Sequence, residues 1–135
     1  DSNFTAMYLF AQADLLIEQR KYDQAFQLFD SIMTAFPYHS LGDEILIKKA
    51  YAMELQGQWK KAIDFYDELL KYYGEDILAD DAIYRKGILY MDQLNNLEEA
   101  QICFKSILID HKGSLHTTDA RKRFRQLRGD TNVED

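Results

Sequence analysis

The residues with the most reactive side chains are one cysteine, Cys103, and three histidines, His39, His111 and His116. Nucleophilic catalysis needs a thiol or hydroxyl beside a base, and a zinc site needs three or four converging ligands. Cys103 lies between two large apolar residues, which is typical of a buried, unreactive thiol. His111 and His116 are separated by a glycine-containing helix break, so they do not share a helix face. We therefore predict no catalytic residue, no metal site and no bound cofactor.

The carboxylates and the search for catalytic motifs lead to the same interpretation. The sequence contains no Gly-x4-Gly-Lys-Ser/Thr loop, no Gly-x-Ser-x-Gly elbow and no His-Glu-x2-His pair. Several acids instead precede a base by four residues, a spacing that stabilises exposed helices. These pairs are Glu44–Lys48, Asp67–Lys71, Asp81–Arg85 and Asp119–Arg123. We expect that the chain is not an enzyme.

The composition is that of a globular chain with an acidic balance. Of 135 residues, 47% are hydrophobic and 29% are charged, and the formal net charge is −7. This charge disfavours general nucleic-acid binding. No apolar run reaches the length of a membrane-spanning helix, so no integral membrane segment is expected. A lone cysteine excludes an intrachain disulfide and leaves the cellular compartment open.

The chain repeats itself with a period of about 37 residues. The stretches 22–29, 59–66 and 97–104 each read large apolar, two polar, alanine, three residues, aromatic. Their alanines are 37 and 38 residues apart, at Ala25, Ala62 and Ala100. A small residue recurs upstream with the same phase, as Ala13, Ala50 and Gly87. Phased copies of this kind indicate a repeat architecture.

Each repeat divides into two amphipathic segments. Apolar residues follow helical spacing in both halves, for example Leu9, Ala13 and Leu16, then Ala25, Phe29 and Ile32. No segment shows the sustained alternation of a strand. We predict an all-α fold with helices near residues 3–19, 22–36, 41–56, 58–72, 77–94 and 97–111.

A seventh helix, residues 115–128, is expected to cover the last apolar face of the stack. It is strongly basic, with cations that include Arg121, Lys122, Arg125 and Arg128. The favoured interpretation is a solvated outer face, whose late cations also suit a helix C-terminus. A docking patch for an acidic protein or an anionic lipid surface is the alternative. We expect one domain over residues 1–129, with repeats at about 6–37, 43–74 and 80–112, and a polar tail over 130–135.

The three phased copies resemble the tetratricopeptide repeat, whose mark is a helix hairpin with Ala-x3-aromatic in its second helix. The leucine that usually precedes the small residue of the first helix is replaced here by Gln12, Lys49 and Lys86. The resemblance implies a right-handed α-α superhelix of three hairpins and a capping helix. The long linkers between repeats resemble those of bacterial cell-envelope proteins, namely the Tol-Pal accessory protein and the outer-membrane assembly lipoproteins.

The resemblance also implies a concave groove, lined by the first helix of each hairpin, in which a protein or peptide segment binds. The positions carried over from the family are Phe10, Asp14, Ile17, Ile47, Lys48, Tyr51, Leu55, Tyr84, Arg85, Ile88 and Met91. Packing of some of these residues against neighbouring helices is the competing interpretation. The family's clamp for a C-terminal carboxylate is not expected, because Phe10 and Asp14 stand where donors are needed.

The favoured function is therefore a non-catalytic adaptor or scaffold that binds a partner segment, and the resemblance implies a place within a bacterial cell-envelope assembly. The alternative is a structural segment of a longer repeat protein, or a self-associating scaffold whose groove is filled by its own chain or by another copy. Localisation in the periplasm or at the outer membrane follows from the resemblance alone, and a cytoplasmic location stays open.

Overall fold

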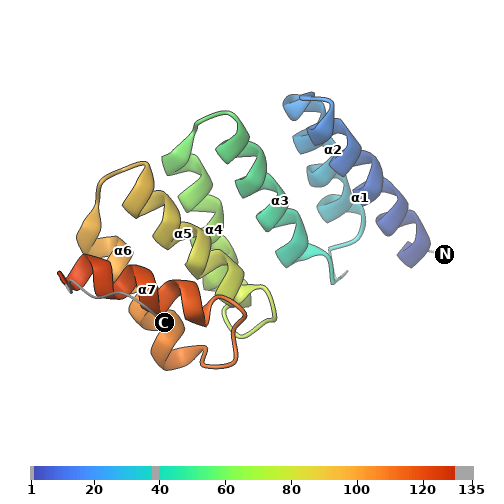
Figure 1. The fold of residues 1–135 in the computed structure, drawn as a ribbon. Coiled ribbons are helices and arrows are strands. Elements are labelled where there is room, and N and C mark those ends of the chain that lie inside the picture. Colours follow the sequence, from blue (N-terminus) through green and yellow to red (C-terminus); the bar gives the residue numbers. More distant parts are fainter. Residues whose placement is uncertain (1, 38–39, 130–135) are drawn as a thin grey trace.

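A computed structural model describes residues 2–37 and 40–129, and within them it contains helices and turns but no strand. Figure 1 shows the helices in chain order. Their bounds are α1 Ser2–Glu18, α2 Tyr22–Ala35, α3 Gly42–Leu55, α4 Trp59–Tyr73, α5 Ala79–Asp92, α6 Leu97–Asp110 and α7 Thr117–Arg128. Each predicted helix agrees with one of these to within two residues at either end. Within the described residues, none of the helices is long and apolar enough to cross a lipid bilayer.

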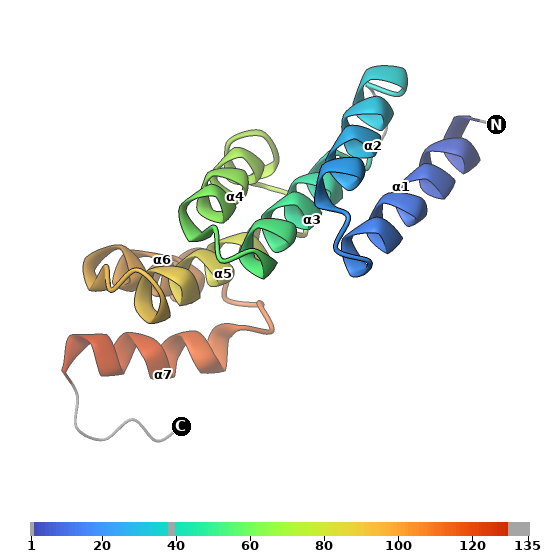
Figure 2. The same ribbon diagram turned by 90° about the horizontal axis from the view of Figure 1, so that it is seen from above.

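The helices form three antiparallel hairpins that stack side by side, followed by a single helix. Figure 2 shows the first helices, α1, α3 and α5, in one curved row with α7 at its end, and the second helices, α2, α4 and α6, in a row behind them. The predicted all-α solenoid of three hairpins and a closing helix is confirmed. The inner side of this curve is formed by the first helices.

The Ala-x3-aromatic pattern places the centre of each hairpin core. The three alanines Ala25, Ala62 and Ala100 are fully buried, and so are the aromatic residues that follow four positions later, Phe29, Tyr66 and Phe104. A small residue lets the two helices of a hairpin approach closely, and the aromatic ring fills the space one turn further along. The sequence pattern therefore fixes which face of each second helix is buried.

Each core is completed by the first helix of the next repeat. Leu41, Ile45 and Ala52 of the α3 segment belong to the core of the α1–α2 hairpin. The equivalent residues, 37 positions later, are Leu78, Ala82 and Leu89, and they pack into the core of the α3–α4 hairpin. Ala120 and Leu127 of α7 complete the third core in the same way. No hairpin encloses its core alone, so each core is complete only when the next helix has stacked on the hairpin.

In α3 and α5, a lysine takes the place of the leucine that usually precedes the small residue, and it forms an ion pair with the preceding hairpin. Lys49 of α3 reaches back to α2, where its ammonium lies 2.8 Å from the carboxylate of Asp30 and over the ring of Phe26 at 5.6 Å. Lys86 of α5 pairs in the same way with Asp67 of α4. The long aliphatic stems pack between hairpins, as leucine would, while the charged ends form ion pairs.

We predict that Gly87→Ala destabilises the protein. Alanine favours a helix by about 1 kcal/mol over glycine, but the added Cβ would lie 2.7 Å from a ring carbon of buried Phe104. Overpacking of this kind costs about 1–3 kcal/mol, so we expect a net loss near 1 kcal/mol in urea unfolding. Gly113→Ala is the matched control, because nothing lies within 4 Å of its added Cβ. A higher unfolding midpoint for Gly87→Ala would contradict this packing.

Candidate protein-binding groove

The inner side of the stack is hollowed at the first two hairpins. One hollow of about 570 Å³ is lined by Glu18, Ile47, Lys48, Tyr51, Glu54, Tyr66 and Arg85. A second, of about 560 Å³, is lined by Ile17, Glu18, Arg20, Tyr22, Tyr51, Leu55 and Gln56. Because the two share Glu18 and Tyr51, we treat them together and call them the inner groove. Its lining comes mainly from α1, α3 and α5, with Tyr22 of α2, Tyr66 of α4 and the turn residues Arg20 and Gln56.

The floor of the inner groove is a fixed charged group. The Glu54 side chain is only 10% exposed, and it accepts hydrogen bonds from the Tyr66 hydroxyl and from the Arg85 guanidinium. Burial and the neighbouring carboxylate raise the pKa of Tyr66, so its hydroxyl stays protonated and donates. Burial opposes the charge of Arg85, but the hydrogen bond and charge of Glu54 raise its pKa overall. The guanidinium, whose side chain is 40% exposed, is therefore held in one place at the groove surface.

Cations recur along the row of first helices at the repeat period. Lys48, Arg85 and Arg123 are 37 and 38 residues apart. Each pairs with an acid on the preceding helix of the row: Lys48 with Asp14 at 3.1 Å, Arg85 with Glu54, and Arg123 with Asp92 at 3.3 Å. Of the four pairs expected within single helices, Asp119–Arg123 forms, at 2.9 Å. Asp67 pairs with Lys86 of the next hairpin, and Asp81 with His116. The charges thus join neighbouring repeats.

Six of the predicted groove residues line the inner groove. They are Ile17, Ile47, Lys48, Tyr51, Leu55 and Arg85. Tyr51 and Leu55 are among the exposed large hydrophobic residues of the molecule, so the groove offers apolar surface beside its fixed cation. Asp14 is half-buried and holds Lys48 at the edge of the hollow.

Three predicted groove residues pack in the hydrophobic core. Ile17 is 1% exposed and packs in the first core, and Ile88 is 9% exposed and packs in the third. Phe10 is half-buried against the first core, with its ring centroid 5.7 Å from that of Phe29. The competing interpretation, packing against neighbouring helices, accounts for Phe10 and Ile88, whereas Ile17 both packs in the core and borders the second hollow.

Two further predicted residues are engaged by α7. The Tyr84 hydroxyl donates to Asp119, and its ring stacks on His116 with centroids 4.1 Å apart. Burial, followed by the hydrogen bond to Asp119, raises the pKa of Tyr84. Met91 packs against the third core, and an Arg123 N–H lies 3.5 Å from its sulfur. Because α7 takes the place of a fourth first helix, it covers the part of α5 that contains Tyr84 and Met91.

Sequence reasoning missed several groove residues. Glu18, Arg20, Tyr22, Glu54, Gln56 and Tyr66 line the inner groove but were not predicted. Arg85 occupies the position of Lys48, but the repeat equivalent of Asp14, the partner of Lys48, is Tyr51, so the repeat period does not indicate Glu54. The contribution of Tyr66 carried no signal either, since its aromatic position is typical of core.

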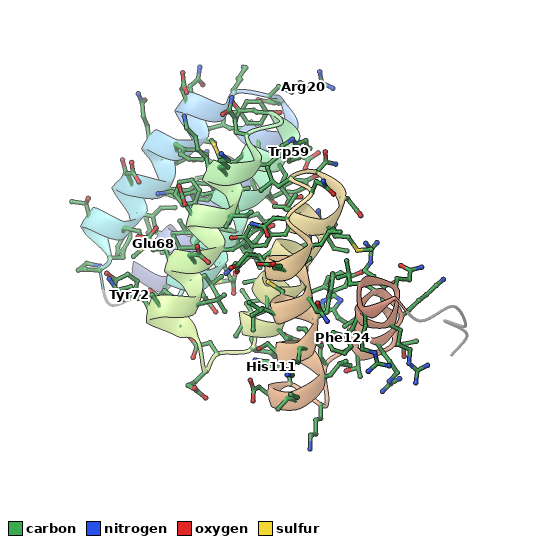
Figure 3. All side chains as sticks on the ribbon, turned by 90° about the vertical axis from the view of Figure 1, so that its left-hand side faces the viewer. Arg20, Trp59, Glu68, Tyr72, His111 and Phe124 are labelled. Atoms are coloured by element: carbon green, nitrogen blue, oxygen red, sulfur yellow. The ribbon has the colours of Figure 1, made fainter. Side chains whose placement is uncertain are left out.

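The basic residues of α7 lie at the end of the stack. Arg121 and Arg125 are half-buried, and Lys122 and Arg128 are exposed. The Arg128 guanidinium lies 5.6 Å from the ring centroid of Phe124, which packs against the third core (Figure 3). The expected polar tail, 130–135, lies outside the described residues.

One group within the described residues combines potential metal ligands, namely Asp80, Asp81 and His116. His116 Nε2 lies 2.6 Å from Asp81 Oδ1, so the imidazole already has a partner. Both carboxylates are in the first turn of α5, where the helix dipole favours anions. An ion pair and a helix terminus account for this arrangement without a metal. His39 lies outside the described residues.

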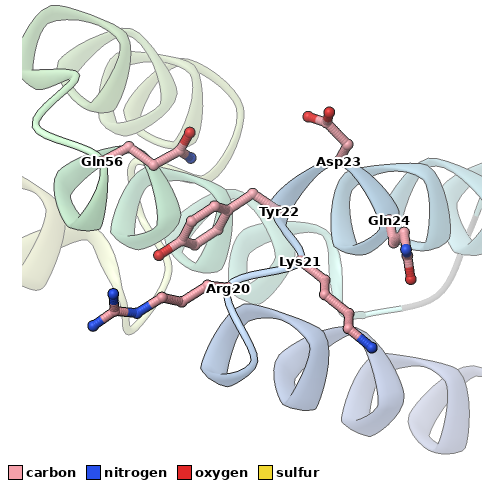
Figure 4. A pocket seen from close by; sticks show the side chains of 6 residues that line it. All are labelled: Arg20, Lys21, Tyr22, Asp23, Gln24 and Gln56. Atoms are coloured by element: carbon pink, nitrogen blue, oxygen red, sulfur yellow. The ribbon is translucent and has the colours of Figure 1, made fainter.

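A strained turn borders the groove. Arg20 has φ 62°, in the left-handed region, and Gly57 and Asn95 occupy the equivalent positions of the next two hairpins with φ 70° and 50°. Glycine and asparagine adopt this conformation readily, whereas arginine does not. Figure 4 shows Arg20 at this turn with Tyr22 beside it and Gln56 across from them, around a small hollow of about 310 Å³. A strained arginine at the rim of a groove points to a role for its side chain.

The comparisons with known proteins agree with this architecture. Residues 8–37 and 44–76 match the family model of the tetratricopeptide repeat, and the third hairpin lies outside these ranges. A tetratricopeptide repeat protein from Parabacteroides merdae has a similar solved structure, with a TM-score of 0.69 and 24% identity. The match covers 92% of this chain and 46% of that one. Two stretches of the chain thus match the tetratricopeptide repeat, and the fold is that of the similar solved structure.

One curated protein is also similar in sequence. It is the outer membrane protein assembly factor BamD of Xylella fastidiosa, 21% identical over 145 residues. The similarity covers 95% of this chain and 50% of BamD. The chain therefore spans about half the length of the curated relative it matches.

We predict that the Cys103 thiol is unreactive in the folded protein. The expected buried position is confirmed, and burial raises the pKa of the Cys103 thiol from 9.0 to about 11. A shift of this size lowers the thiolate fraction at pH 8 by roughly a hundredfold. Labelling with 5,5′-dithiobis(2-nitrobenzoic acid) should be at least that much slower than in guanidinium chloride. A native rate close to the denatured rate would show that the third core opens readily.

We predict that Arg20→Gly stabilises the fold, because glycine adopts the left-handed turn without strain. A gain of about 0.5–1 kcal/mol is expected in urea unfolding. Gln19→Gly is the matched control, since Gln19 is exposed in the same turn but its φ is not positive. The control should lose stability. Equal losses for both variants would mean that the turn is not strained at Arg20.

Proposed function

We propose that these tetratricopeptide repeats form a non-catalytic interaction module, which binds a segment of a partner protein in the inner groove. Repeats of this family generally mediate protein–protein interaction. The observation that carries the proposal is the meeting of exposed apolar residues, Tyr51 and Leu55, with a guanidinium fixed from below by Glu54. Apolar surface supplies affinity, and a preorganised donor supplies orientation at low entropic cost.

The shape of the groove favours an extended or helical segment with a large apolar side chain. Ile47, Tyr51 and Leu55 follow one another at intervals of four on α3, so they form one stripe that faces the inner side. The cations of the groove, Lys48, Arg85 and the rim residue Arg20, lie around this stripe. A partner with an apolar residue next to hydrogen-bond acceptors would complement both.

The similarity to BamD supports a place in a bacterial cell-envelope assembly, because that protein is named as an outer membrane protein assembly factor. At 21% identity and half the length of BamD, the similarity motivates the proposal and does not specify a partner. The alternative, a structural segment of a longer repeat protein, draws support from the exposed apolar residues of α1.

We predict that Tyr51→Ala abolishes capture of the partner. The wild-type chain and the variant would be used as baits in a lysate of the source organism, with captured proteins identified by mass spectrometry. Truncating a central aromatic contact typically costs tenfold or more, roughly, in affinity. Tyr72→Ala is the matched control, because Tyr72 is an exposed tyrosine on α4 that points away from the stack (Figure 3).

The helical circular dichroism of both variants should match that of the wild type, since neither tyrosine is in a core. Retention of the same partner by Tyr51→Ala would exclude the inner groove as the binding site. Arg20→Gly offers an independent check, because it should weaken capture while raising stability.

A further inference from the structure

The outer side of α1 carries the most extensive exposed apolar surface of any described helix. Phe4, Tyr8 and Leu15 are 70%, 56% and 56% exposed, and we call them the α1 outer face. The rings of Phe4 and Tyr8 stack with centroids 6.5 Å apart. Met7 between them is also exposed. Burying large apolar side chains contributes about 1.5–3 kcal/mol each, so a face of this kind indicates an interface.

The repeat period shows what this face corresponds to elsewhere in the chain. Moving 37 residues along, Phe4, Tyr8 and Leu15 become Leu41, Ile45 and Ala52. A further 37 residues lead to Leu78, Ala82 and Leu89. For the last copy the spacing is 38 residues instead of 37. The equivalents there are His116, which immediately precedes α7, and Ala120 and Leu127 within it. The α1 outer face is therefore the first of four copies of one surface.

Every other copy of this surface is covered by a second helix of the preceding hairpin. Ile45 and Ala52 are buried in the core that contains Phe29 and Ile32 of α2. Ala82 and Leu89 are buried against the residues of α4, and Ala120 against those of α6. The same positions thus meet the same kind of helix three times.

We infer that the α1 outer face is an interface for the second helix of a further repeat hairpin, which stands before α1 in the same superhelix. The occupant is defined by the three helices that cover the other copies: an amphipathic helix with Ala-x3-aromatic-x2-aliphatic on its buried face. The curated and structural relatives are about twice as long as this chain, so stacks with additional hairpins accord with the comparison.

A second copy of the chain fits this face less well. In a head-to-tail arrangement the α1 outer face would meet the outer side of α7, where Lys122, Gln126 and Arg128 are exposed. Such a contact would bury the Lys122 ammonium against the apolar surface of Phe4 and Tyr8. The covering helix also needs no acid at the position of Asp30, because Gln12 replaces the lysine of the later repeats.

The test is an extension of the chain by one of its own hairpins, which replaces residues 1–3. Residues 41–77 are fused directly before Phe4, which repeats the junction that Ile77 makes with Leu78. Seating of α4 on the α1 outer face should slow amide hydrogen exchange over residues 4–15 by at least about tenfold. It should also raise the thermal midpoint by several degrees, roughly, because adjacent repeats stabilise each other. Tyr8→Lys should remove both gains and leave the unextended chain unchanged.

Two controls make the outcome decisive. In the first, the extended chain carries Phe4→Leu and Tyr8→Ala, which are the residues at the equivalent positions 78 and 82. A gain in stability seen only with these changes would show that the native α1 outer face does not accept such a helix. In the second, sedimentation of the unextended chain measures self-association, and a dimer that Tyr8→Lys abolishes would assign the face to a second copy. Either result would overturn the inference. Neither depends on partner capture through Tyr51, so the groove proposal stands or fails separately.

Discussion

The structure depends on one packing constraint: no hairpin buries its own core, and the second helix of each repeat must be covered by the first helix of the next. Leu41, Ile45 and Ala52 meet this requirement for the first hairpin, and the equivalent residues meet it for the others. Because the covering positions recur at the repeat period, the first helices are forced into one row. The inner groove is the surface of that row, so the same packing that stabilises the fold also creates the candidate site.

The electrostatics of the groove follow from the same arrangement. First helices lie side by side, so a cation on one reaches an acid on the one before it, as Lys48 reaches Asp14 and Arg85 reaches Glu54. Burying the Glu54 carboxylate costs desolvation free energy, which the Tyr66 hydroxyl and the Arg85 guanidinium offset. As a result, the Glu54 carboxylate fixes the position of the Arg85 guanidinium, which also lines the hollow. Preorganised donors of this kind bind with a small entropic penalty.

The fold could be predicted from the sequence because the pattern of alanine followed four positions later by an aromatic residue occurs three times in phase. In each copy this pattern marks the buried face of the second helix of a hairpin. The groove could be predicted only in part. Ile47, Tyr51 and Leu55 do line the hollow, but Ile17 and Ile88 pack in the core, since a step of one position rotates a side chain by about 100° around a helix. Glu54 was missed because its partner lies 31 residues away. Tyr84 is occupied by α7, which residue spacing alone does not reveal.

The two lysines between hairpins also disfavour some wrong pairings of the repeats. Lys49 meets Asp30 and Lys86 meets Asp67, but the position equivalent to these acids in α6 is Lys105, and the position equivalent to the lysines in α7 is Phe124. If α3 docked on α6, Lys49 would face Lys105 across a closed interface; if α7 docked on α2, Asp30 would face an aromatic ring. Chains built from similar units are prone to mispairing and to exchange of units between molecules during folding. Here the charges disfavour docking of α3 on α6 and of α7 on α2, so they restrict which repeats can become neighbours.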